Sequence, residues 1–467
     1  MLIHSGSCVA AGAAAVLATA ALAAAAAVPG GASASPSTPR VSSAVCQPHP
    51  GRFCLPPRDG LGLGQQLVGL AERGKSDRGS AVPWTPTECA EHTGHRCYTA
   101  RHVQRAYGLD RLHQRGITGE GEEIAFVMPL GNRDLQRDLD AFSDANGLPR
   151  TTVEVHRLGD VPDADPTDVD QAVNLSELAL DVESAHAAAP GARITVVSTP
   201  VNILQGPAGW QEAAEAVDWL TGHRTPTVIS FSYGIYERNL HRPGQPNDPG
   251  LLRGWRRSLE RAALAGTTVV AAAGDTGPTG PDLTGRLHPA RTVPWPAADP
   301  LVTGVTGTTL HLDDAGNRVH DDELWTAQGS PYAGGAGYSR IFPGSRSADV
   351  AMAASPANRM WFYSSVSTLP GQTPGWQRAA GTSLGAPWFA GTVALAAQRN
   401  GAHLGPLTRT LARIHPGEDG TQDLVDGCNT ANGVVGFCAH PGPDAASGIG
   451  TVRDADAFTA ALARLSR

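Results

Sequence analysis

The sequence lacks the features of several protein classes. Its formal net charge is −8 at pH 7 and Lys75 is its only lysine, so the positive excess typical of nucleic-acid-binding proteins is absent. No two cysteines have the two-residue spacing that thiolate zinc sites favour. Beyond residue 28 no apolar stretch approaches the length of a membrane span, and no internal repeat is found. We therefore expect no nucleic-acid partner.

The N-terminus contains the one long apolar run. Residues 8–28 are rich in alanine, and Ala32-Ser33-Ala34 follows with the small-x-small pattern of an export cleavage site. The run is also long enough to remain as a membrane anchor. Because the cleavage pattern precedes a Ser/Pro-rich stretch, we interpret residues 1–34 as a signal peptide. The mature protein is then secreted, has no membrane partner and is expected to be a monomer.

Six of the seven cysteines lie beyond this segment. Six cysteines allow 15 pairings, and export makes disulfides plausible. The cysteines fall into three close pairs, so the simplest assignment is Cys46–Cys54, Cys89–Cys97 and Cys428–Cys438.

Apolar runs alternate with helical patterns along most of the chain. This alternation predicts an α/β fold, a central parallel sheet with helices on both faces. Residues 35–95 are rich in Pro, Gly and polar side chains, so we expect a poorly packed N-terminal extension before a domain at 96–467. The predicted strands are 124–128, 194–197, 228–232, 268–273 and 302–305, and the predicted helices include 211–221 and 252–265.

Ser383 is the candidate nucleophile. Gly381-Thr382-Ser383 leads directly into a helix that continues from Trp388 to Gln398. The first backbone N–H groups of a helix have no intrahelical partner, so they face any oxyanion that forms on this serine. Acyl transfer requires such a nucleophile beside oxyanion donors. The alternative is a turn that only caps the helix.

Two acids on one helix face are the next candidates. Glu177 and Asp181 are four residues apart, so on a helix their Cβ atoms lie about 5–6 Å apart. The apolar residues around them predict a mostly buried helix. Two carboxyls in an apolar setting repel each other as anions, so one of them tends to hold a proton. The alternative is a pair of solvated surface acids.

Asp275 follows the buried strand 269–273 and is bounded by Gly274 and Gly277. Acids at the carboxyl end of a parallel strand lie where α/β active sites are built, although an aspartate there can also only shape a turn. The strand within 228–234 ends in small residues, and its edge is suited to pairing with an extended peptide.

Together these segments resemble the sedolisins, or serine-carboxyl peptidases. The family's Glu-x-x-x-Asp is similar to Glu177 and Asp181, its Ser-Gly-Asp-Ser-Gly to residues 273–277, and its Gly-Thr-Ser to residues 381–383. The glycine-rich segment 334–339 is similar as well. The resemblance implies a subtilisin-like fold with Ser383 as nucleophile, Glu177 as general base and Asp181 orienting Glu177. It also implies that Asp275 is a neutral acid donating to the oxyanion.

The resemblance further implies a secreted peptidase that cleaves proteins or peptides at acidic pH, because a carboxylic-acid donor must keep its proton. We expect an endopeptidase, and tripeptidyl-peptidase action stays open. Family members usually carry a large folded prodomain, whereas residues 35–95 are short, so a non-catalytic peptide-binding relative is the alternative. A Ser-His-Asp subtilase is disfavoured, because Asp275 lies late in the domain and none of His288, His311 and His320 precedes a glycine.

One calcium ion is implied near the C-terminus. Sedolisins bind calcium through an aspartate, the next carbonyl, two further carbonyls and a final aspartate. The matching residues here are Asp423, Leu424, His440, Gly442 and Asp444. With a water these supply the six oxygens that a hard cation accepts. Asp426 is a competing ligand, and a metal-free turn region is the alternative.

Overall fold

The structure is a computed structural model, and it describes residues 83–201, 207–240, 249–366 and 374–467. The predicted signal peptide 1–34, the Cys46–Cys54 pair and most of the extension 35–95 lie outside the described residues.

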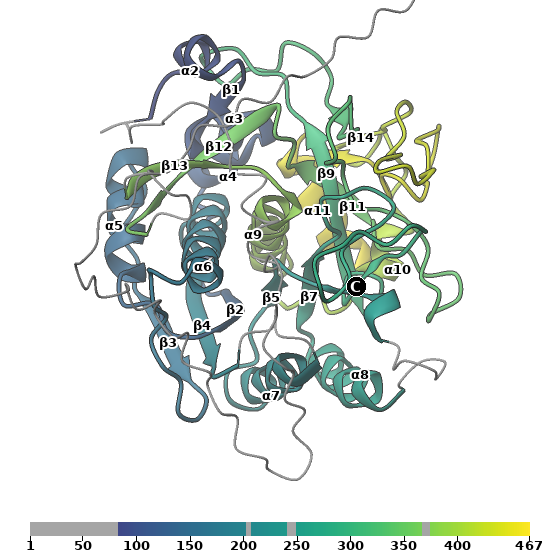
Figure 1. Cartoon of the computed structure of the whole chain (residues 1–467). Helices are drawn as coiled ribbons and strands as arrows, with labels where there is room; N and C mark the ends of the chain where they lie inside the picture. Colours follow the sequence, from purple (N-terminus) through teal and green to yellow (C-terminus); the bar gives the residue numbers. More distant parts are fainter. Residues whose placement is uncertain (1–82, 202–206, 241–248, 367–373) are drawn as a thin grey trace, which may run out of the picture. The chain divides into compact units, whose positions relative to one another are not determined.

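A large, mostly parallel sheet forms the centre of the described chain (Figure 1). Every pair from β3 to β15 is parallel, and the short β14 and β10 add antiparallel partners. All five predicted strands are present, so the predicted parallel sheet is confirmed. In spatial order the strands are β14 (Thr421–Gln422), β15 (Thr451–Val452), β11 (Val350–Ala353), β9 (Val302–Thr309), β7 (Thr268–Ala272), β5 (Val228–Phe231), β2 (Glu123–Pro129), β4 (Arg193–Thr199) and β3 (Val153–Arg157), with β10 (Glu323–Leu324) beside β9.

Helices cover both faces of this sheet (Figure 1). Alternate residues of one strand point to opposite faces, so Val228 and Val270 enter one core whereas Ile229 and Val269 enter the other. The first core packs α3 (Ala100–Tyr107), α4 (Leu109–Gln114), α5 (Leu135–Asn146), α6 (Val169–Ala188), α9 (Thr382–Asn400) and α11 (Ala455–Leu465). The second core packs α7 (Pro207–His223) and α8 (Pro249–Leu264).

The central helices α6 and α9 lie side by side at close range (Figure 1). Gly391 permits this approach, because a Cβ there would lie 2.3 Å from the Cβ of Ala188. Both helices are buried on nearly all sides, as expected of helices in a core. Their contact sets the distance between the side chains of α6 and the N-terminus of α9.

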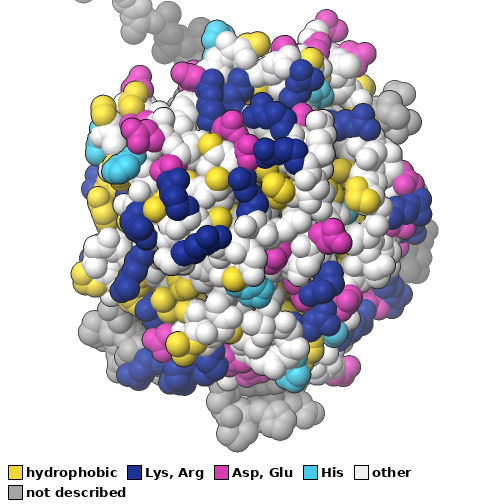
Figure 2. All heavy atoms as spheres, turned by 180° about the vertical axis from the view of Figure 1, so that it is seen from behind, with side chains coloured by type: hydrophobic (Ala, Val, Ile, Leu, Met, Phe, Trp, Pro, Cys, Tyr) yellow, Lys and Arg dark blue, Asp and Glu magenta, His cyan; other side chains and the backbone are white. Residues whose placement is uncertain are grey.

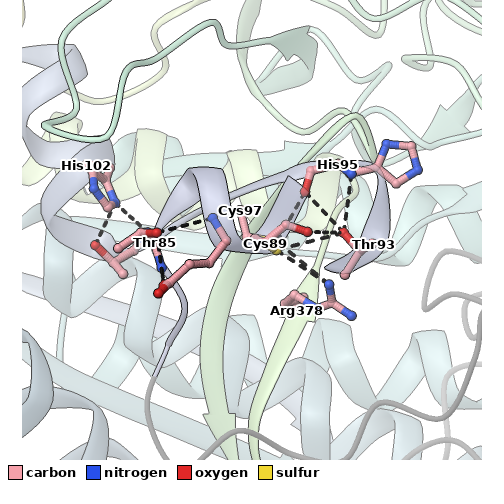
Figure 3. Close-up of a disulfide and its surroundings, with 9 residues drawn as sticks. Thr85, Cys89, Thr93, His95, Cys97, His102 and Arg378 are labelled. Atoms are coloured by element: carbon pink, nitrogen blue, oxygen red, sulfur yellow. Dashed lines mark hydrogen bonds between the residues drawn. A yellow bond between two sulfur atoms is a disulfide. The ribbon is translucent and has the colours of Figure 1, made fainter. Parts of the chain in front are cut away.

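A second, three-stranded sheet joins β1 (Arg96–Tyr98), β12 (Asn358–Ser364) and β13 (Gly375–Ala379). The preceding α2 (Pro86–Thr93) is tied to β1 by the disulfide Cys89–Cys97 (Figure 3). The Arg378 guanidinium lies 3.5 Å from Cys89 Sγ and stacks over the Trp84 and Trp361 rings. Residues 83–95, predicted as the end of a poorly packed extension, are therefore held on the main body.

The remaining described elements are short. They are β6 (Ile235–Tyr236), β8 (Pro294–Trp295), the 3-10 helix η2 (Glu237–Leu240) and α10 (Thr408–Leu411). The predicted pairing of Cys428 with Cys438 is also present as a disulfide. Across the described ranges, no helix has the length and apolarity needed to cross a membrane.

Charges of both signs are mixed on the surface. Figure 2 shows arginines and acidic side chains intermingled on the face opposite to that in Figure 1. Ion pairs such as Arg115–Asp456 and Arg453–Asp321 have substantially exposed partners. Exposed pairs of this kind contribute about 0–1 kcal/mol each, so we attribute the stability of the fold mainly to the two cores.

Candidate active site

Ser383 lies in the first turn of α9, at the edge of the sheet where β5 and β7 end. Gly381 precedes the helix with φ of 136°, and its N–H donates to Ala354 O at 2.7 Å. The Leu384 N–H donates to Gly381 O. The Ser383 N–H has no assigned acceptor among the described residues, so it is available to an anion at the helix start.

Glu177 faces this serine from α6. From Ala172 to Ala188 every residue except Glu177 is buried, so the predicted buried helix is confirmed. Glu177 is the one position in this stretch that is partly exposed. Burial raises the pKa of Glu177 to about 7, the Ser383 hydroxyl lowers it through a hydrogen bond, and the charge of Asp275 raises it. The Glu177 Oε1 atom is buried and has no hydrogen-bond partner within the described part of the chain.

Asp181 lies one turn further along α6 and is only 1% exposed. Burial raises its pKa well above the ordinary value, and the nearby Glu177 carboxyl raises it further. Ser232 Oγ lies 2.5 Å from Asp181 Oδ1, within hydrogen-bond distance. The two acids of α6 are thus coupled, and together they resist losing both protons.

Asp275 approaches from the end of β7. Its Oδ1 accepts hydrogen bonds from the Thr382 N–H at 2.7 Å and the Thr382 hydroxyl at 2.9 Å. A Cβ on Gly381 would lie 2.9 Å from Asp275 Oδ2 and 3.3 Å from Ser383 Oγ. The bare Gly381 therefore lies between the free carboxyl oxygen of Asp275 and the serine hydroxyl. Burial raises the pKa of Asp275.

The structure brings together the four candidate residues, Ser383, Glu177, Asp181 and Asp275. Sequence reasoning missed two of their neighbours. Thr382 holds Asp275 through two hydrogen bonds, and Ser232, assigned only to a substrate-pairing strand, touches Asp181. A small polar residue directly after a buried parallel strand is the signal that could have identified Ser232.

The raised pKa of Glu177 predicts a stability that depends on pH. A carboxyl with a raised folded-state pKa contributes stability that is complete below its ordinary value, 4.5, and is lost as the pH rises through about 7. Glutamine has no proton to lose. We expect Glu177→Gln to melt at a higher temperature than the wild type at pH 8 but not at pH 4.

Differential scanning calorimetry at the two pH values measures this effect. Glu120→Gln, at an exposed position, is the matched control and should leave the difference between the two melting temperatures unchanged. A Glu177→Gln protein that loses stability with pH as the wild type does would contradict the prediction.

The five predicted calcium ligands lie in two neighbouring segments. The Gly442 N–H donates to Asp423 Oδ2 at 2.8 Å, and the His440 N–H donates to Asp444 Oδ2 at 2.9 Å. Asp423 Oδ1 is buried without a partner, and the carbonyls of Leu424, His440 and Gly442 accept no assigned hydrogen bond from the described residues. Oxygens of these two kinds are the ligands that a hard cation accepts, whereas both carboxyl oxygens of Asp444 already accept hydrogen bonds from the protein.

Asp426, the competing ligand, is exposed, and one of its oxygens accepts from the Gly427 N–H. No group of three or more His, Cys, Asp or Glu side chains suited to a metal occurs in the part of the chain that the structure describes. The predicted site uses only two such side chains, Asp423 and Asp444, because His440 is assigned through its carbonyl oxygen like Leu424 and Gly442.

The chain is similar to several known proteins. The sequence model of the subtilase family matches residues 174–413. Kumamolisin from Bacillus sp. is 31% identical over 378 residues, which cover 76% of this chain and 62% of kumamolisin. Tripeptidyl-peptidase sed5 from Aspergillus fumigatus is 25% identical over 379 residues, which cover 72% of this chain and 62% of that protein.

A solved structure also matches. Pseudomonas sedolisin, a serine-carboxyl proteinase complexed with two molecules of pseudo-iodotyrostatin, gives a TM-score of 0.61 at 22% identity. The match covers 78% of this chain and 98% of that one. It confirms the predicted subtilisin-like fold. The chain spans about three fifths of the length of the two curated relatives above.

Proposed function

The chain belongs to the subtilase family, with sedolisins among its relatives, and from the carboxyls around Ser383 we propose that it is a serine-carboxyl peptidase. The observation that carries this proposal is the convergence of three groups: the Ser383 hydroxyl and the Asp275 carboxyl both influence the pKa of Glu177, which burial raises to about 7. A carboxylate of raised pKa is a stronger base than an ordinary one, which suits it to take the serine proton.

In the proposed reaction, Ser383 Oγ attacks the scissile carbonyl carbon while its proton passes to Glu177. The resulting oxyanion accepts hydrogen bonds from the Ser383 N–H and from protonated Asp275 Oδ2. Glu177 then returns its proton to the leaving amine, and water attacks the acyl-enzyme by the same route. Asp181 holds a proton beside Glu177, so that the pair carries a single negative charge when Glu177 acts as base.

The proposed working range is mildly acidic to neutral. Asp275 must keep its proton to donate, which sets the upper limit of the range. Glu177 must lose its proton to act as base, which sets the lower limit. Because burial raises the pKa of both groups, the range extends closer to neutrality than two ordinary carboxyls would allow.

We propose that the protein is secreted and cleaves proteins or peptides internally. Tripeptidyl-peptidase sed5 is a relative, so removal of N-terminal tripeptides is the second candidate activity. Hydrolysis of a denatured protein between pH 3 and 8, by wild-type and Ser383→Ala protein, tests the proposal.

We also propose that Asp423, Asp444 and the carbonyls of Leu424, His440 and Gly442 hold one calcium ion. The unpartnered Asp423 Oδ1 supports this assignment. The ion would stabilise the C-terminal loops, about forty residues beyond Ser383 in the sequence. The Cys428–Cys438 disulfide would constrain the segment between Leu424 and His440.

Calcium is expected to raise the melting temperature of the protein at pH 6. Binding to the folded state alone stabilises it by about 2.7 kcal/mol at a hundredfold excess over the dissociation constant. Both carboxylates must be ionised to bind the ion, so the rise should be smaller at pH 3. Calorimetry of dialysed protein with and without added Ca²⁺ measures it.

Asp423→Asn should abolish the calcium response, whereas Asp426→Ala should retain it. No response at pH 6 in the wild type, or an equal response in Asp423→Asn, would rule out the site.

A further inference from the structure

Pro387 leaves one carbonyl of α9 without its usual partner. In an α-helix the N–H of residue i donates to the carbonyl of residue i−4. Proline has no N–H, and the residue four positions before Pro387 is Ser383. The carbonyl of the proposed nucleophile is therefore free to accept a hydrogen bond from outside the helix.

Ser232 supplies that hydrogen bond. It follows β5 directly, and its Oγ lies 3.1 Å from Ser383 O and 2.5 Å from Asp181 Oδ1. The side chain is 9% exposed, so little water competes for either contact. A single serine hydroxyl thus connects the main chain of α9 with a carboxyl of α6.

The protonation of Asp181 lets both contacts form together. A serine hydroxyl has one hydrogen and can also accept. Neutral Asp181 donates to Ser232 Oγ, and the serine hydrogen then goes to Ser383 O. Glu177 and Tyr233 are the ionisable groups that interact electrostatically with Asp181. Glu177 in turn interacts electrostatically with Asp275. Glu183, which accepts from the Tyr363 N–H, interacts instead with Asp138.

We infer that Ser232 is a positioning residue. It holds Asp181 beside the Ser383 carbonyl, which lacks a helical hydrogen bond because residue 387 is a proline. Because Glu177 lies one turn before Asp181, this contact fixes the side of α6 that faces Ser383 Oγ. The inference rests on the proposed function, since it assigns Ser232 a part in aligning the proposed nucleophile and base.

Three variants test the role of Ser232. Losing the two hydrogen bonds of the Ser232 hydroxyl is expected to lower kcat about five- to tenfold, with KM nearly unchanged, because Ser232 holds catalytic groups rather than substrate. Ser232→Ala should show this loss. Ser232→Thr, which keeps the hydroxyl, should recover most of kcat. Ser230→Ala is the matched control, because Ser230 lies two residues earlier in β5 and its buried hydroxyl has no hydrogen-bond partner among the described residues.

A loss in KM rather than kcat, no recovery with threonine, or an equal loss in Ser230→Ala would overturn the inference.

Pro387→Ala tests the origin of the contact. Alanine restores the N–H that an α-helix directs at Ser383 O, so Ser232→Ala should destabilise the protein less in the Pro387→Ala background than in the wild type. Chemical unfolding of the two single variants and the double variant measures this coupling without any activity. Additive effects of the two substitutions on the free energy of unfolding would overturn this inference but leave the proposed function in place. An inactive wild-type protein with coupling present would overturn the proposed function and, with it, the catalytic role of Ser232.

Discussion

Ser383→Ala is expected to hydrolyse a denatured protein about 10⁴–10⁶ times more slowly than the wild type at the pH of maximum activity, by analogy with removal of the nucleophile from other serine peptidases. Alanine removes the only atom that can form the acyl-enzyme. Alanine differs from serine only by the missing hydroxyl, so the fold should persist. The residual rate would reflect binding and oxyanion stabilisation.

The measurement is product formation over pH 3 to 8, with the melting temperature of each protein as the folding control. Equal hydrolysis by both proteins would reject Ser383 as nucleophile. No hydrolysis by either would favour the non-catalytic peptide-binding alternative. Mass spectrometry of the products separates the two candidate activities: internal fragments support an endopeptidase, and a ladder of N-terminal tripeptides would replace that proposal by a tripeptidyl-peptidase.

Asp275→Ala is expected to lower kcat by about 10²–10³, the typical effect of removing one oxyanion donor. Asp275→Asn should lower kcat less than Asp275→Ala does. Thr382 donates twice to Oδ1, so an asparagine would keep its carbonyl oxygen there and turn its NH₂ group to the position of Oδ2. An amide at that position can donate to the oxyanion as the protonated acid does.

The pH profile adds a second readout for Asp275. An amide does not ionise, so Asp275→Asn should lose the decline in activity that the wild type shows when Asp275 loses its proton at higher pH. Steady-state kinetics of both variants over pH 3 to 8 measure the two effects. Indistinguishable rates for Asn and Ala, or an unchanged decline in Asn, would contradict the role of Asp275 as a neutral donor.

Local patterns in the sequence determined the sheet and the two helices that carry the candidate site. Runs such as 124–128 and 268–273 have mostly apolar residues on both faces. A strand of this kind is stable only where other elements cover both faces of the sheet. The apolar environment of Glu177 and Asp181 likewise predicted a buried α6. Gly381-Thr382-Ser383 identified the helix start, because glycine and the following helix pattern are local signals.

Contacts between distant segments decided the rest. That Asp275 offers only Oδ2 to a substrate depends on Thr382, more than a hundred residues away. The link from Asp181 through Ser232 to the Ser383 carbonyl joins three segments that no local pattern relates. The attachment of α2 to the main body likewise depends on Arg378. Propensity and periodicity report only on neighbours in the chain, whereas the direction of a hydrogen bond and the burial that raises a pKa depend on which elements pack together.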